Sequence, residues 1–142
     1  MQISQDYNTS AYTFRSYQAG KAQVFAPLGD NVIISPDTAS AVATVHTLEH
    51  SFWMLPQKLV EQWEPRSLDE LTAAHLAPLL DEKPELLILG TGEKIRFPKQ
   101  EITQILTSRR IGVEVMGNSA ACRTYNFLIS DRRRVAIAIL ID

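Results

Sequence analysis

The sequence predicts an α/β fold of three layers, in which helices and short antiparallel N-terminal strands flank a central mixed, mostly parallel sheet of about five strands. The observations behind this prediction lie in the C-terminal half. Three apolar runs, at residues 86–89, 113–116 and 134–141, are separated by helical patterns over 99–108 and 118–129. Strands joined through helices pair in parallel, because each crossover connection must span the sheet.

Composition limits the classes of protein that need to be considered. A chain of 142 residues is the usual size of one domain, so we expect residues 1–142 to form a single α/β domain, with residues 1–11 frayed. The net charge of -2 argues against a polycation that binds nucleic acid. The single cysteine, Cys122, excludes an intramolecular disulfide and fits a reducing compartment. We find neither a signal-peptide pattern nor an apolar run of the about 20 residues that span a bilayer, so we expect a cytoplasmic protein without an integral membrane segment.

The N-terminal half predicts short strands separated by turns. Alternating residues over 12–17 and the run 22–25 predict two strands around a turn at 18–21. Residues 31–35 predict a strand that Pro36 ends. The segment 39–47 stays open between strand and helix, because it mixes β-branched residues with alanines. Further predictions are a strand at 51–55 before Pro56 and a single helical turn within 57–63.

The first long helix is expected to follow. Ser67 and Glu70 have the spacing of a capping box, and leucines then recur at helical spacing, which predicts a helix from Ser67 toward Leu80 that Pro78 kinks or ends early.

The remaining elements complete the parallel part of the sheet. Residues 86–89 are consecutively apolar, which favours a strand covered on both faces. A helix follows Pro98 and runs to about Ser108, and residues 113–116 predict a second buried strand. Asn118 and Ser119 are candidate N-cap residues for a helix that reaches about Ile129.

A phosphate-binding loop is one interpretation of Gly90-Thr91-Gly92, which follows a strand. The dinucleotide-binding fingerprint, however, needs a third glycine and a helix that opens directly from the loop, and residues 93–98 intervene here. Glycine is also the usual residue in tight turns. The sequence therefore favours a structural turn, with nucleotide binding as the alternative.

Metal and thiol chemistry were also weighed. His46 and His50 would align on a helix, but the local pattern is strand-like and would place them about 13 Å apart, so we predict no metal site. His75 is expected at the boundary of the core. Cys122 lies in the first turn of a predicted helix, where the thiol could be reactive, but no base or second cysteine accompanies it. A buried structural thiol is therefore favoured.

Charged and aromatic residues add three hypotheses. Glu114 lies in a strand expected to be buried, so we expect it to pair with Arg123, either structurally or as part of a pocket at the strand ends. The arginines at 109–110 and 132–134 are expected at solvated edges or against an acidic partner. Trp63 would suit an interface if it were exposed.

The same residues carry a resemblance to a known family. The stretches that carry it are Leu87 to Gly92, Arg96-Phe97-Pro98, Gly112 to Met116, Ala120 to Asn126, and Arg134-Val135-Ala136. They resemble the family of small bacterial and archaeal proteins of unknown function that includes the mitochondrial respiratory complex I assembly factor three. The resemblance extends more loosely to residues 51–56 with Trp63 and to residues 14–24, whereas residues 27–50 look longer than this family would have.

The resemblance implies a three-layer α/β domain without an established activity, cofactor or catalytic residue. It also implies protein partners, such as respiratory complex subunits or assembly factors, so we expect a non-enzymatic accessory protein that acts by protein binding. The alternative is a small anionic-ligand-binding protein or an uncharacterised enzyme, with a pocket at the strand C-termini. The residues expected at such a pocket are Gly90, Thr91, Gly92, Glu114, Arg123 and Asn126.

Overall fold

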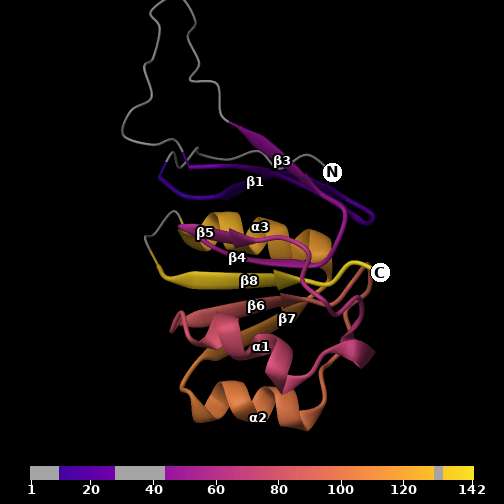
Figure 1. Cartoon of the computed structure of the whole chain (residues 1–142), viewed down its shortest axis with the longest axis vertical. Helices are drawn as coiled ribbons and strands as arrows, with labels where there is room; N and C mark the ends of the chain where they lie inside the picture. The colour runs from indigo at the N-terminus through magenta and orange to yellow at the C-terminus, as the bar shows by residue number, and fades with distance from the viewer. Residues whose placement is uncertain (1–9, 28–43, 130–132) are drawn as a thin grey trace, which may run out of the picture.

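The chain folds into two β-sheets with helices between and beside them, as Figure 1 shows. The structure, a computed structural model, describes residues 10–27, 44–129 and 133–142. The predicted strand at 31–35 and most of the open segment 39–47 lie outside the described residues. The end of that segment belongs to a strand, since β3 spans Val45–Leu48.

The first sheet is a small antiparallel one. It contains β1 (Thr13–Gln18), β2 (Lys21–Phe25) and β3 in the order β1-β2-β3. Gly20, with φ of +75°, closes the turn between β1 and β2, which is a conformation that glycine adopts without strain. The two predicted N-terminal strands and the turn between them are therefore confirmed.

The second sheet has five strands in the order β5-β4-β8-β6-β7. Its central strand, β6 (Leu86–Gly90), pairs in parallel with both β8 (Val135–Ile139) and β7 (Gly112–Met116). Strand β4 (Phe52–Leu55) pairs antiparallel with β8, and β5 (Lys58–Val60) pairs antiparallel with β4. The sheet is thus mixed, as predicted.

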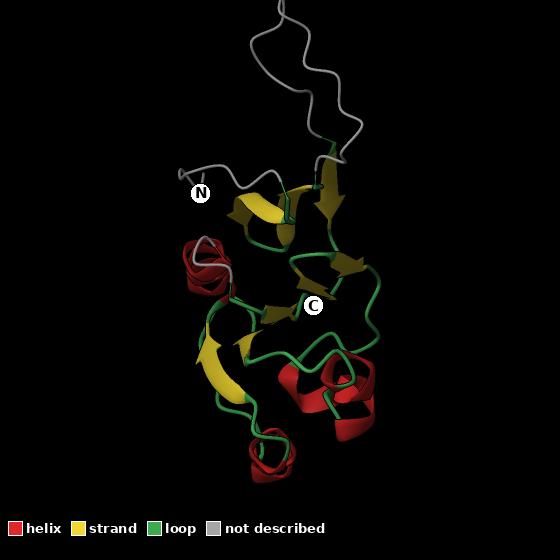
Figure 2. Ribbon diagram, turned by 90° about the vertical axis from the view of Figure 1, so that its left-hand side faces the viewer, coloured by secondary structure: helices red, strands yellow, loops and turns green. Residues whose placement is uncertain are grey.

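Helices cover both faces of this sheet, as Figure 2 shows. Helix α3 (Asn118–Ile129) lies on one face, and α1 (Ala73–Leu80) and α2 (Gln100–Ser108) lie on the other. The α3 helix also contacts β1, so it packs against both sheets. None of the helices in the described residues is long and apolar enough to cross a lipid bilayer.

Side chains of the central strand alternate between two apolar cores. Ile88 points into a core with Phe14 and Tyr125, whose rings meet edge to face with centroids 5.5 Å apart. Leu87 and Leu89 point into the core beneath α1 and α2. Leu87, Ile88 and Leu89 are all fully buried, which confirms that β6 is covered on both faces.

The prediction of a helical turn within 57–63 is wrong. Residues 56 and 57 form a turn, and β5 then runs back along β4, with Val60 opposite Trp53. Pairing with β4 outweighs the weak local helix propensity of this short segment.

The predicted start of the long helix is also wrong. Ser67 makes no side-chain capping bond, and only a single 3-10 turn, η1 (Leu68–Glu70), follows it. Leu71 has an extended backbone, which interrupts the helix. Helix α1 instead begins after Thr72, which forms a capping box with His75, and it continues through Pro78 to Leu80.

Strand β7 is less buried than predicted. Gly112 and Glu114 are exposed, and the other residues of this strand are half-buried. The reason is its place at the end of the sheet, where only β6 pairs with it among the described residues. Its apolar run favoured a buried strand, but strand order cannot be obtained from local periodicity.

Candidate functional site

The carboxyl ends of β6 and β8 lie against the start of α3, where the predicted pocket was expected. Gly90 ends β6, and a β-carbon built on it would lie 2.5 Å from Oδ1 of Asn118 and 2.6 Å from Cδ1 of Ile139. Such distances are far shorter than van der Waals contact. Glycine is therefore required at position 90 because a helix and a neighbouring strand pack directly against its α-carbon.

Asn118 connects three segments at this point. Its Oδ1 accepts a hydrogen bond from the Gly92 amide at 3.0 Å, and its Nδ2 donates to the Tyr17 hydroxyl and the Leu140 carbonyl, each at 2.9 Å. The residue is only 1% exposed. The prediction that Asn118 caps α3 is wrong, because these contacts occupy its side-chain amide and Asn118 itself is the first helical residue.

Thr91 and Gly92 form the turn that follows β6. The Thr91 hydroxyl donates to the Lys94 carbonyl and accepts from the Arg96 amide, each at 2.9 Å. Gly92 has φ of +112°, and its carbonyl accepts from the Asn118 amide at 2.8 Å. Because these groups bind one another, the geometry supports the structural interpretation of Gly90-Thr91-Gly92 rather than a phosphate-binding loop.

Tyr17 brings the first sheet into the same network. Its hydroxyl donates to Oε1 of Glu93 and accepts from the Gly20 amide at 3.3 Å. Burial, followed by the hydrogen bond to Glu93, raises the pKa of Tyr17 to about 12. The hydroxyl therefore stays protonated at neutral pH and links the β1–β2 turn to the loop after β6. We call Tyr17, Gly92, Glu93 and Asn118 the polar junction.

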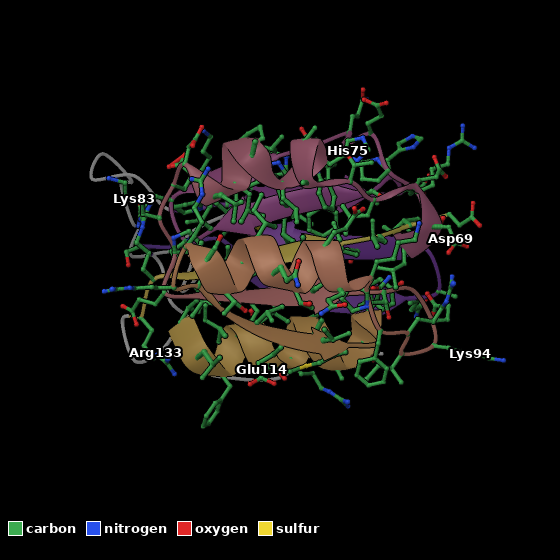
Figure 3. The ribbon with its side chains drawn as sticks, turned by 90° about the horizontal axis from the view of Figure 1, so that it is seen from below. Asp69, His75, Lys83, Lys94, Glu114 and Arg133 are labelled. Carbon is green, nitrogen blue, oxygen red and sulfur yellow. The ribbon has the colours of Figure 1, made fainter. Side chains whose placement is uncertain are left out.

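The other predicted site residues lie apart from this junction. Asn126 is buried and makes two hydrogen bonds to Phe14 of β1. Its side-chain amide donates to the Phe14 carbonyl and accepts from the Phe14 amide, each at 2.8 Å. Arg123 is exposed on α3, and Glu114 is exposed on β7. Figure 3 places Glu114 on the opposite side of α2 from His75. Since β7 leaves Glu114 in solvent, the burial that suggested a pair with Arg123 does not exist.

Cys122 is fully buried in the core between α3 and the sheet. Burial raises the pKa of its thiol far above the ordinary value, and the charge of Glu93 acts in the same direction. Desolvation thus outweighs the lowering of the thiol pKa that a helix N-terminus would cause. This supports the prediction of a structural thiol.

His75 and Trp63 both make structural hydrogen bonds. His75 is half-buried, and its Nδ1 accepts from the Thr72 amide at 3.0 Å, which confirms its boundary position. Trp63 is 9% exposed and donates from its indole nitrogen to the His75 carbonyl at 3.1 Å, so it is not an exposed interface residue. Among the described residues, no three His, Cys, Asp or Glu side chains are grouped to hold a metal ion.

The sequence interpretation missed two features of the surface. Ile95, Phe97 and Phe127 are large apolar residues with exposed fractions of 52%, 78% and 71%. Basic and apolar residues alternate in the loop 94–97, and this pattern could have indicated that Ile95 and Phe97 are exposed. The second feature is an open cavity of about 520 Å³ that is lined by Glu49, His50, Ser51, Gln62, Trp63, Glu64, Arg66, Ile141 and Asp142.

Comparison with known proteins decides the family. The family described as a protein of unknown function (DUF498/DUF598) matches residues 32–140. The chain belongs to this family. The match includes the stretches between Leu87 and Ala136 that carry the resemblance, so the family expected from the sequence is confirmed.

Three relatives show the extent of the similarity. The 13 kDa major membrane protein of Francisella tularensis is 33% identical over 73 residues, which cover 51% of this chain and 59% of that protein. The NADH dehydrogenase (ubiquinone) 1 alpha subcomplex assembly factor 3 of Danio rerio is 35% identical over 89 residues, which cover 61% of this chain and 51% of that protein. The chain thus spans about half the length of the curated relatives it matches. The solution structure of a Xanthomonas campestris protein is 33% identical, covers 99% of this chain and 92% of its own, and superposes with a TM-score of 0.72.

Proposed function

We propose that this chain is a non-enzymatic accessory protein that binds other proteins during assembly of the respiratory NADH:ubiquinone oxidoreductase. The observation that carries the proposal is the similarity to assembly factor 3 of Danio rerio over 61% of this chain. Fold alone does not determine function, so a surface suited to protein binding is also needed.

The loop between β6 and α2 supplies such a surface. Ile95 and Phe97 expose more than half of their surface, although the backbone between them is held in place. The Arg96 amide binds the Thr91 hydroxyl, and the Arg96 guanidinium binds Asp69 at 3.0 Å. Apolar groups on an ordered loop bind a partner with little loss of backbone entropy. Aromatic residues are also enriched among the residues that contribute most to binding.

Affinity capture from gently solubilised cells of the native host tests this proposal. The bait is the tagged full chain, the control is an untagged strain, and bound proteins are identified by mass spectrometry. We expect enrichment of NADH dehydrogenase subunits or of other assembly factors. A bait that enriches no protein above the control contradicts the proposal.

Variants of the loop locate the binding surface. Ile95→Ser with Phe97→Ser is expected to reduce capture at least tenfold without a change in melting temperature, because both side chains are already in solvent. Phe127→Ser is the matched control, since Phe127 is similarly exposed but belongs to α3. Equal capture by the loop variant and by the wild type would exclude this loop as the docking surface.

A further inference from the structure

The outer edge of β7 has backbone groups directed away from the sheet. The Gly112 amide donates to the Glu85 carbonyl at 3.1 Å, and the Thr91 amide donates to the Met116 carbonyl at 3.0 Å. These bonds show which residues of β7 bond to β6. The N–H and C=O groups of Gly112, Glu114 and Met116 point toward β6. The intervening residues, Val113 and Val115, therefore direct their N–H and C=O groups outward.

No other strand of the described residues covers this edge. Strand β7 ends the order of the sheet, and Figure 2 shows the helices placed over the two faces of the sheet. An edge with unpaired N–H and C=O groups is a template for another strand. From this placement we propose that β7 binds an extended segment of a partner protein, which adds a sixth strand to the sheet. This inference rests on the proposed protein-binding function.

The side chains of β7 indicate what this segment contains. Glu114 is exposed in the middle of the strand, and a cationic side chain opposite it gives a favourable cross-strand pair. A second copy of the chain is a poorer occupant, because the antiparallel register centred on Glu114 places two carboxylates opposite each other. The segment is therefore an extended one that presents Lys or Arg to Glu114.

The α3 helix packs against the carboxyl end of β7, and three side chains of β7 remain half-buried. The Thr124 hydroxyl contacts Sδ of Met116 at 3.3 Å, which fixes the distance of α3 from the end of β7. Met116, Val113 and Val115 are half-buried, so a sixth strand would cover apolar surface as well as form hydrogen bonds. Strand addition in other recognition domains uses the same combination of main-chain bonds and side-chain contacts.

Proline substitution can remove an outward amide without breaking the inward ladder. Val115→Pro deletes an N–H that faces away from β6, and proline is tolerated on edge strands in this orientation. Val115→Thr is the matched control, because threonine keeps both the N–H group and the β-branched shape. Glu114→Lys reverses the charge that we expect to face the partner. Melting curves of all three variants establish that they are folded.

Capture from the native host is then quantified for the partner that the wild-type bait enriches. We expect Val115→Pro and Glu114→Lys to lower capture at least tenfold and Val115→Thr to retain it. Equal capture by Val115→Pro and the wild type overturns the strand-addition proposal and leaves the proposed function standing. A loss with Val115→Thr equal to that with Val115→Pro also overturns it, since the outward amide would not be responsible. A wild-type bait that enriches nothing removes the proposed function and this inference together.

Hydrogen exchange of the wild-type complex gives a test without substitutions. We expect the Val113 and Val115 amides to exchange at least tenfold more slowly in the purified complex than in the free chain. Unchanged exchange at both amides overturns the proposal. Analytical ultracentrifugation of the purified chain distinguishes the other occupant: a wild-type dimer that Val115→Pro converts to a monomer would assign the edge to a second copy and overturn the proposed partner.

Discussion

Gly90 and Asn118 are in contact at the point where the central strand ends and α3 begins. A β-carbon at position 90 would lie 2.5 Å from Oδ1 of Asn118, the atom that accepts the Gly92 amide. Asn118 can therefore make its hydrogen bonds only because Gly90 has no side chain. It joins β6, β8 and α3 to the first sheet through Tyr17.

Gly90→Ala should destabilise the fold. The added methyl group must displace either the Asn118 amide or Ile139, both of which are buried, and overpacking of this kind costs about 1–3 kcal/mol. The free energy of unfolding from denaturant titration measures the loss. Gly112→Ala is the control, because the atom nearest to its β-carbon would be the flexible end of the Leu86 side chain, at 3.3 Å. This variant should change stability by less than about 1 kcal/mol. Equal losses in the two variants would contradict the close packing at Gly90.

Asn118→Ala should remove the hydrogen-bond partner of the Gly92 amide, the Tyr17 hydroxyl and the Leu140 carbonyl. Buried polar groups left without partners make this a loss of about 2–4 kcal/mol in the free energy of unfolding. The same denaturant titration measures it, with the exposed Gln100→Ala as a control expected within about 0.5 kcal/mol of the wild type. A stable Asn118→Ala protein would show that the polar junction does not hold the segments together.

Tyr17 should make stability depend on alkaline pH. Its pKa is raised from 10.0 to about 12 in the folded state, so folding favours the protonated hydroxyl. Its contribution is complete below pH 10 and is lost as the pH rises from 10 through about 12. The free energy of unfolding, measured by denaturant titration across this range, should therefore fall with pH.

Tyr17→Phe separates this contribution from those of other tyrosines. The variant should be less stable at neutral pH, because it loses the bonds to Glu93 and Asn118, and its stability should fall less steeply above pH 10. Tyr125, whose pKa burial also raises, remains in both proteins and accounts for the residual slope. Identical slopes for the variant and the wild type would contradict the assignment to Tyr17.

Cys122 should be unreactive in the folded protein. Its thiol is fully buried and its pKa is raised, so a thiol reagent at neutral pH must wait for the fold to open. We expect labelling by an aromatic disulfide reagent to be at least about a hundredfold slower in native protein than in denaturant. Rapid native labelling, with Cys122→Ala as the blank, would instead support the reactive-thiol hypothesis.

Local patterns predicted the central strand β6 and the helix α3 correctly. The apolar run of β6 and the spacing of apolar residues in α3 indicate a strand and a helix regardless of which elements pack against them. The prediction of a helix from Ser67 is wrong. Ser67 and Glu70 have the spacing of a capping box, but the backbone becomes extended at Leu71. The predicted site residues are only partly brought together, since Gly90 to Gly92 form one turn while Glu114 and Arg123 face solvent.

The sequence by itself determined the α/β class, the parallel pairing and the family, because periodicity and short motifs are properties of neighbouring residues. Tertiary structure alone decided that β7 is an edge strand, that Asn118 binds across three segments rather than capping its helix, and that Ile95 and Phe97 remain exposed. Each of these depends on contacts between residues far apart in the chain. Such contacts arise only when the strands are ordered in the sheet and the helices are placed on its faces.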